Sequence, residues 1–296
     1  MNTGDLSELD VFYGELTVNR ASVYARLPRP TDDTGLRLTG QVTGPRCFNT
    51  RTLPTTTHLF DLGAGPTLLS RALLLDPSYW SPDLPSIYDV TIELRRGAKV
   101  LATARREIGF KPLGVRSRSF VLQGKPWVLR GVCATSSTAL LPREWHAACA
   151  TFVTDEMDAR LAEASQRGAM AVVELSGEAN EIISRLHILT MFPAAILAVI
   201  RGHLPRQFAI KGVAPNLLLA QPLDPIREFA LQPWAHSIWA EPSEPSVLAE
   251  LQTTTDLPIV AVRRLLSPHP VDQARAACDK LQRDLASVGQ FAGYVV

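Results

Sequence analysis

Residues 80–132, WSPDLPSIYDVTIELRRGAKVLATARREIGFKPLGVRSRSFVLQGKPWVLRGV, contain the pattern that decides the fold. Residues 90–94 alternate apolar and polar side chains, as a half-buried strand does. Residues 95–99 form a charged turn that contains Gly97, and residues 100–106 return as a second strand. This half of the stretch therefore predicts a β-hairpin.

A second hairpin is predicted directly afterwards. Residues 119–122 and 126–132 flank the short polar turn 123–125, in which Gly124 tolerates a positive φ. The later of the two segments is mostly apolar and predicts a buried strand. We therefore expect two hairpin-like strand pairs that lead into one buried strand.

Composition limits the class of protein. The chain has 296 residues, 46% of them apolar and 20% charged, which is ordinary for a soluble globular protein of one large or two medium domains. The formal net charge is +1 with the two signs interspersed, so the sequence predicts no nucleic-acid partner. The longest apolar run, residues 191–200, is about half the length of a membrane span, so no membrane association is expected.

The cysteines and the N-terminus point to a compartment. Cys47, Cys133, Cys149 and Cys278 have neither metal-type nor CxxC spacing, so we expect free, mostly buried thiols rather than disulfides. The first ten residues are polar and acidic and contain no apolar segment of an export signal. We therefore expect a cytoplasmic protein. No Gly-rich phosphate loop, zinc spacing or Ser/His/Asp signature is present, so no cofactor and no metal are expected.

The pattern of apolar and polar residues changes after Arg118. Residues 9–111 contain short strand-like runs without a helical stretch, which predicts an all-β sandwich. Beyond Arg118, apolar runs alternate with amphipathic segments, as in βα units around a parallel sheet. Eight strands are predicted there, at residues 127–133, 149–153, 169–175, 194–200, 216–220, 236–240, 258–262 and 291–296. The best helix candidates are residues 155–167, 178–189, 246–254 and 271–287.

The quoted stretch resembles the glycoside hydrolase family 2 enzymes, the β-galactosidase and β-glucuronidase group. The residues that match the family are Trp80-Ser81-Pro82, Pro85, Tyr88, Gly109-Phe110-Lys111, Phe120, Gly124-Lys125-Pro126 and Leu129-Arg130-Gly131-Val132. The resemblance implies a multidomain β and α/β protein, with an immunoglobulin-like β-sandwich at residues 1–117 and a compact, degenerate (β/α)8 TIM-type barrel at residues 118–296. It also implies that the jelly-roll domain that begins the family's enzymes is missing here or encoded separately.

The resemblance also implies two catalytic glutamates, which this chain lacks. The family places its acid/base at the end of the fourth barrel strand and its nucleophile at the end of the seventh. Here those positions are His203, after Gly202, and Arg263. An arginine stays protonated and has no lone pair for attack. Cys133 also replaces a family asparagine, and Thr135-Ser136 replace a His-Glu pair. We expect no catalytic residues, with His203 and Arg263 lying near one another at the strand C-terminal face.

Other polar residues follow predicted strands. Glu174, Asp224 and Glu241 end or follow the third, fifth and sixth strands, on the functional face of a barrel. Glu174 and Glu241 form either a relocated catalytic pair, or they cap helices or pair with Arg201, Arg263 or Arg264. His236 and Trp239 either flank a sugar or belong to the core. The candidate ligand-binding set is Glu174, His203, Asp224, His236, Trp239, Glu241 and Arg263.

The preferred hypothesis is a catalytically inactive family relative that binds carbohydrate or acts as a scaffold or interaction protein. Its partners would be a carbohydrate, another protein or a second copy of the chain. The alternative is an active hydrolase of β-glycosides that uses the relocated Glu174 and Glu241.

Overall fold

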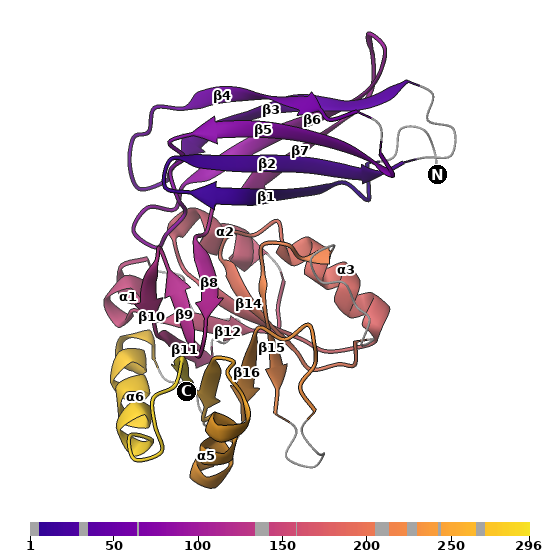
Figure 1. Ribbon diagram of the computed structural model, residues 1–296. Helices are drawn as coiled ribbons and strands as arrows, with labels where there is room; N and C mark the ends of the chain where they lie inside the picture. Colours follow the sequence, from indigo (N-terminus) through magenta and orange to yellow (C-terminus); the bar gives the residue numbers. More distant parts are fainter. Residues whose placement is uncertain are drawn as a thin grey trace. The chain divides into compact units, whose positions relative to one another are not determined.

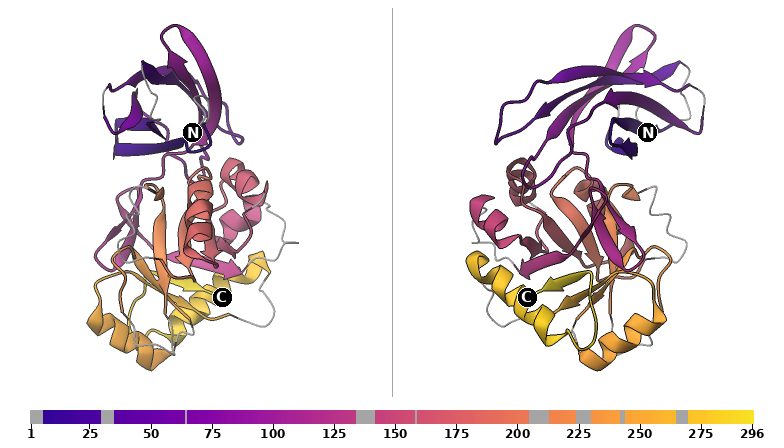
Figure 2. Two further views of the ribbon diagram at one scale, coloured as in Figure 1. Left: turned by 90° about the vertical axis from the view of Figure 1, so that its right-hand side faces the viewer. Right: turned by 60° about the vertical axis from the view of Figure 1, so that its left-hand side comes forward.

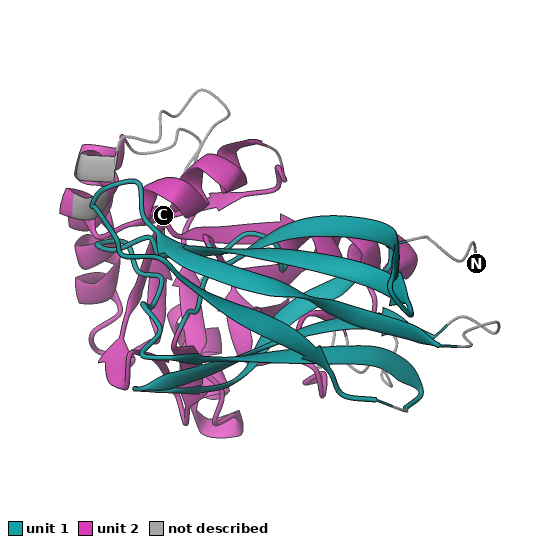
Figure 3. Ribbon diagram, turned by 90° about the horizontal axis from the view of Figure 1, so that it is seen from above, with its two compact units in different colours: residues 1–111, 190–193 teal, residues 112–189, 194–296 magenta. Residues whose placement is uncertain are grey.

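The computed structural model describes residues 6–29, 35–63, 65–133, 142–157, 159–204, 213–223, 230–241, 244–264 and 270–296. The chain divides into two compact units (Figure 3). Unit 1 comprises residues 1–111 and 190–193, and unit 2 comprises residues 112–189 and 194–296. The sequence predicted a domain boundary between residues 117 and 118. The structure instead assigns residues 112–117, which contain a short strand, to unit 2.

Unit 1 is built from seven antiparallel strands (Figures 1 and 2). The strands are β1 (Asp10–Thr17), β2 (Arg20–Pro28), β3 (Leu36–Arg46), β4 (Thr55–Asp61), β5 (Thr67–Leu75), β6 (Ile87–Arg96) and β7 (Lys99–Ile108). Their order is β1-β2-β5-β4-β3-β6-β7. The strand β4 pairs with both β5 and β3 and so joins two halves, β1-β2-β5-β4 and β3-β6-β7. This is the strand order of a constant-type immunoglobulin sandwich.

The core of unit 1 follows from the alternation that the sequence displays. Every second side chain of β2 and of β6 is buried, and these side chains form one cluster. Tyr13 and Tyr88 each pack a ring on Phe110, with centroids 5.6 and 4.8 Å apart. The Tyr13 hydroxyl donates to the carbonyl of Lys111 at 3.0 Å. The predicted hairpin at Gly97 is confirmed, with a positive φ at that glycine.

Unit 2 begins with a three-stranded antiparallel sheet of β8 (Leu113–Arg116), β9 (Ser119–Leu122) and β10 (Lys125–Trp127). Gln123 and Gly124 connect the last two strands, both with positive φ, as a two-residue type I′ turn requires. The prediction of one continuous strand over 126–132 was wrong. Residues 125–127 pair with β9, and the chain then enters the barrel at Leu129. The short strand β8 was not predicted.

The eight predicted barrel strands are confirmed, and they close into a barrel (Figure 1). They are β11 (Leu129–Cys133), β12 (Thr151–Thr154), β13 (Ala171–Leu175), β14 (Ala195–Ile200), β15 (Leu218–Pro222), β16 (Ser237–Ala240), β17 (Ile259–Val262) and β18 (Gly293–Val295). All neighbours are parallel, and β18 pairs with β11 to complete the closure. Strands such as β14 and β17 are buried at every position, which explains their uninterrupted apolar sequence.

Helices occupy five of the seven connections between barrel strands in the described ranges. They are α1 (Pro142–Ala148), α2 (Ala159–Arg167), α3 (Ala179–Leu189), α5 (Pro245–Thr254) and α6 (Val271–Asp284). The helix α1 was not predicted, and α2 begins later than expected because the Thr154 hydroxyl accepts from the Glu156 N–H in a local turn. The described residues thus form a closed parallel barrel with these five helices in its connections. No helix among the described residues is long and apolar enough to span a membrane.

The seam between β11 and β18 depends on close packing. A Cβ atom at Gly131 would lie 2.8 Å from Val295 Cγ2, and one at Gly293 would lie 2.9 Å from Leu129 Cβ. Any side chain at either glycine would therefore push the two strands apart.

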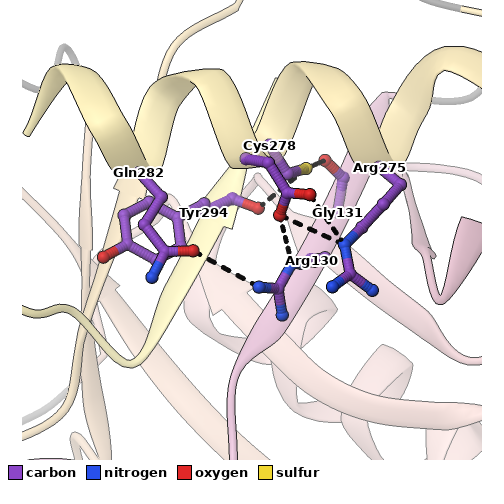
Figure 4. A network of polar contacts seen from close by, with 7 residues as sticks. Arg130, Gly131, Arg275, Cys278, Gln282 and Tyr294 are labelled. Carbon is purple, nitrogen blue, oxygen red and sulfur yellow. Dashed lines mark hydrogen bonds and ion pairs between the residues drawn. The ribbon is translucent and has the colours of Figure 1, made fainter.

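A polar network fastens α6 to the same seam (Figure 4). Arg130 of β11 donates through Nε to Asp279 at 3.1 Å and through Nη2 to Gln282 at 3.3 Å. Arg275 donates to both oxygens of Asp279, at 3.1 and 3.0 Å. The Cys278 thiol lies 3.4 Å from the carbonyl of Gly131. Burial alone would raise the pKa of Asp279, but the hydrogen bonds and charges of Arg275 and Arg130 together lower it.

The cysteines are all free, as expected. The expectation that most are buried was wrong. Only Cys278 is buried, Cys149 is exposed, and the other two are intermediate.

Replacing Asp279 by alanine should lower the free energy of unfolding by roughly 1–2 kcal/mol, because Arg130, only 18% exposed, loses its carboxylate. The folded-state pKa of Asp279 is depressed, so this stability is present above the unfolded pKa and disappears as the pH falls through the folded one. Urea unfolding at pH 7 and pH 3 measures both effects. The control is Asp256→Ala, which breaks a pair whose carboxylate is 92% exposed and should cost less than ~0.5 kcal/mol. Equal losses in the two variants would contradict the prediction.

A buried lysine in unit 1 should make stability depend on pH. Burial lowers the pKa of Lys111 to about 7. Above that pH the unfolded chain still binds a proton that the folded chain has lost, so stability rises with pH by up to roughly 1.4 kcal/mol per unit until the ordinary lysine pKa is reached. Lys111→Met should remove this rise. Unfolding at pH 7, 8 and 9 tests it, with the exposed Lys125→Met as control; an unchanged slope in Lys111→Met would contradict it.

Candidate functional site

Four charged side chains lie at the C-terminal ends of the barrel strands. Glu174 is in β13, Arg201 directly follows β14, Glu241 directly follows β16, and Arg264 comes two residues after β17. In a parallel barrel these ends share one edge, the edge where active sites are built. The sequence placed both carboxylates there.

These four side chains form a closed set of ion pairs, which we call the four-charge ring. Arg201 Nη2 lies 2.8 Å from Glu174 Oε1 and 2.5 Å from Glu241 Oε2. Arg264 Nε lies 2.7 Å from Glu241 Oε1, and its Nη2 contacts Glu174 Oε1. Each arginine therefore touches both glutamates, and the formal charges sum to zero.

The ring is partly shielded from water. Glu174 is the least accessible member, with its side chain 12% exposed. Burial alone would lower the pKa of Arg201 and of Arg264, but hydrogen bonds and charges from Glu174 and Glu241 together raise both pKa values above the ordinary arginine value. The arginines therefore remain cations, and their role is to hold the carboxylates.

A thiol lies beside the ring. Cys133, the last residue of β11, is half-buried, and burial raises the pKa of its thiol. The charge of Arg264 lowers that pKa, while the charges of Glu174 and Glu241 add to its rise. The net shift keeps the thiol protonated near neutral pH, so the residue does not have the character of a thiolate nucleophile.

Arg263 does not reach the ring. Its Nη1 lies 2.6 Å from Asp284 Oδ2, at the end of α6, so its side chain is directed toward the helical layer. The neighbouring Arg264 supplies the side chain that meets Glu174 and Glu241. The family resemblance assigned Arg263 to the place of the lost nucleophile, but it is Arg264 whose side chain joins the carboxylates at this edge. His203 is exposed, two residues beyond Arg201.

Of the two alternatives for His236 and Trp239, flanking a sugar or belonging to the core, the structure favours the second for Trp239 and gives His236 a backbone partner. His236 precedes β16, so it lies at the N-terminal end of that strand, and its Nδ1 accepts from the Leu219 N–H at 3.0 Å. Trp239 is fully buried within the same strand and offers no face to a ligand. Asp224, the remaining candidate, lies outside the described residues.

Two residues of the ring, Arg201 and Arg264, entered the sequence analysis only as pairing partners for the carboxylates. The available signal was positional, since each follows an apolar strand within two residues, as Glu241 does. Throughout the described part of the chain, no three potential metal-ligating side chains gather at one point.

Comparison with known proteins agrees with this architecture. Residues 35–111 match the family described as "Glycosyl hydrolases family 2". No curated protein matches the chain in sequence.

Solved structures match both units. A family 2 glycosyl hydrolase of Bacteroides cellulosilyticus DSM 14838 is 14% identical with a TM-score of 0.64, over 97% of this chain and 45% of that one. A β-glycosidase of Bacteroides vulgatus is 14% identical with a TM-score of 0.62, over 87% and 38%. Bacteroides uniformis β-glucuronidase 2 is 14% identical with a TM-score of 0.60, over 100% and 46%.

The chain thus spans less than half the length of these structures, and at such identity the likeness concerns the fold. The family match in sequence and the fold match in structure cover the two units between them. Residues 35–111 are therefore similar in sequence to the glycosyl hydrolases of family 2, and both units share the fold of the solved family 2 structures.

Proposed function

We propose that the chain is a non-hydrolytic relative of the family 2 glycoside hydrolases that binds carbohydrate or serves as a scaffold for a partner. The observation that carries this proposal is the four-charge ring. It occupies the strand edge where a barrel enzyme holds its reacting groups, and both of its carboxylates contact both arginines.

A retaining glycosidase needs one carboxylate free to attack the anomeric carbon and a second carboxyl that donates a proton to the leaving oxygen. The oxygens of Glu174 and Glu241 already accept hydrogen bonds from Arg201 and Arg264. A substrate would have to displace two cations to reach them. His203 alone cannot complete a mechanism that requires two carboxyl groups, since general acid help contributes only about 10²–10⁴-fold.

One observation favours the alternative, a hydrolase of β-glycosides with a relocated pair. Glu174 Oε1 and Glu241 Oε2 lie 2.8 and 2.5 Å from the same nitrogen of Arg201. Their separation is therefore compatible with the ~5–5.5 Å between the carboxyl groups of retaining enzymes. Activity of this pair would require Arg201 and Arg264 to withdraw when substrate binds.

We expect the purified protein not to release nitrophenol from aryl β-galactosides, β-glucuronides or β-mannosides, because Arg201 and Arg264 hold the carboxylates of Glu174 and Glu241, which would otherwise form the glycosyl-enzyme. The double variant His203→Glu, Arg263→Glu should also be inactive, because the side chain at position 263 is directed toward α6. Absorbance at the nitrophenolate band measures turnover. Wild-type turnover that is lost in both Glu174→Gln and Glu241→Gln would establish the relocated pair and refute the proposal.

A further inference from the structure

The two outer faces of the sandwich in unit 1 differ in chemistry. On the face of β3, β6 and β7 the outward side chains are mostly polar and pair with one another. Arg46 lies 3.2 Å from Asp89, and Arg105 lies 3.7 Å from the same carboxylate. Glu93 and Arg95 form another pair at 2.7 Å. The charged side chains of such a face are hydrated or paired with one another, so they do not require a ligand.

The face of β1, β2, β5 and β4 carries an aromatic row instead. The strand register places Phe12 opposite Tyr24, Tyr24 opposite Arg71, and Arg71 opposite Phe60. Directly opposed residues in a sheet are side-chain neighbours on one face. Four adjacent strands thus contribute one residue each to a straight row of roughly 14 Å, three interstrand spacings of ~4.8 Å. We call these four residues the Arg71 row.

Tyr24 is held in place from two sides. Its ring stacks on Phe12 with centroids 5.4 Å apart and an angle of 17° between the planes. The guanidinium of Arg26 lies 5.2 Å from the centre of the Phe12 ring. The Tyr24 ring also covers Gly14, where a Cβ atom would lie 2.7 Å from Tyr24 Cε2. The tyrosine ring is therefore fixed before any ligand arrives.

Phe60 is the exposed end of the row. Its side chain is 66% exposed, and His58 contacts the ring in an edge arrangement at 6.3 Å. Leu73, on β5 beyond Arg71, is 41% exposed and extends the apolar surface. Exposed apolar surface concentrated on one face of a sheet is typical of a binding surface.

Arg71 lies between Tyr24 and Phe60 in the row and is exposed. Other arginines of this face have carboxylate partners, Arg26 with Asp10 at 2.7 Å and Arg20 with Glu15. Among the described residues Arg71 forms no ion pair, so its five N–H donors are available to a ligand. A guanidinium between two aromatic rings is suited to bind a ligand that carries an anionic group. The rest of such a ligand would have a flat, weakly polar face that packs on the aromatic rings.

We propose that the Arg71 row binds an acidic glycan. The C–H face of a pyranose packs on Tyr24 and on Phe60, and the guanidinium of Arg71 forms paired hydrogen bonds with a carboxylate or a sulfate on the sugar. The positive charge of Arg71 selects the anionic ligand, and the straight row selects an extended chain of sugar rings. This inference rests on the carbohydrate-binding part of the proposed function and is independent of whether the barrel hydrolyses glycosides.

Calorimetry on the full chain with three oligosaccharides of similar length tests the proposal: an oligogalacturonide, a sulfated heparin fragment and a neutral galacto-oligosaccharide. We expect at least one acidic oligosaccharide to bind and the neutral one not to bind. Arg71→Gln should weaken binding about tenfold or more, because the charge-assisted hydrogen bonds are lost. Phe60→Ala should weaken it by a similar factor, since it removes a stacking ring.

Matched controls are Arg37→Gln, an exposed arginine of β3 on the other sheet, and Leu53→Ala, an exposed apolar residue outside the row. Both should leave the affinity within about twofold of wild type, since surface changes away from a site have small effects. Absence of binding, equal affinity for the neutral oligosaccharide, or acidic binding that Arg71→Gln and Phe60→Ala leave unchanged would each overturn the proposal. Self-association of the chain that Phe60→Ala abolishes would overturn it too, in favour of a second copy on this face. Nitrophenol release reports separately on the barrel.

Discussion

The barrel depends on the contact between its first and last strands. The strand β18 pairs with β11, Gly131 and Gly293 let the two backbones approach, and Arg130 with Asp279 fastens the last helix across the seam. Closure removes the unpaired edges that an open sheet would expose. It also brings the C-terminal ends of strands from distant parts of the chain to one edge. Without this closure, the strand ends that carry Glu174 and Arg264 would not be held at one edge, and the two side chains would not be in contact.

The architecture could be predicted because buried strands have a recognisable pattern of apolar residues in the sequence. Strands such as β14 and β17 are covered on both faces, so their sequences are uninterrupted apolar runs between turn residues. The alternation of β6 likewise reported one buried face. The elements that escaped prediction were short or half-exposed. The strand β8 has no buried position, and its partner β9 has one, so neither periodicity nor hydrophobicity reveals the pairing.

The site was harder to predict than the fold. The two carboxylates were found because they lie at the ends of predicted strands, which is a matter of sequence position alone. The choice between Arg263 and Arg264 depended on which side of the strand faces the barrel axis. Since side chains alternate along a strand, an error of one residue exchanges inside for outside. The two alternatives for Trp239 differed in the same way, and its strand position places the indole in the core.

The four-charge ring has a consequence for how such a barrel changes over evolutionary time. Its charges balance only when all four residues are present, so any single replacement leaves an uncompensated charge in a half-buried place. A lineage that moves toward or away from this arrangement by single steps must pass through an unbalanced intermediate, or change two residues together. Residues 174, 201, 241 and 264 should therefore vary as a group among relatives. The joint presence or absence of these four residues would distinguish barrels that contain the four-charge ring from barrels whose carboxylates face a substrate.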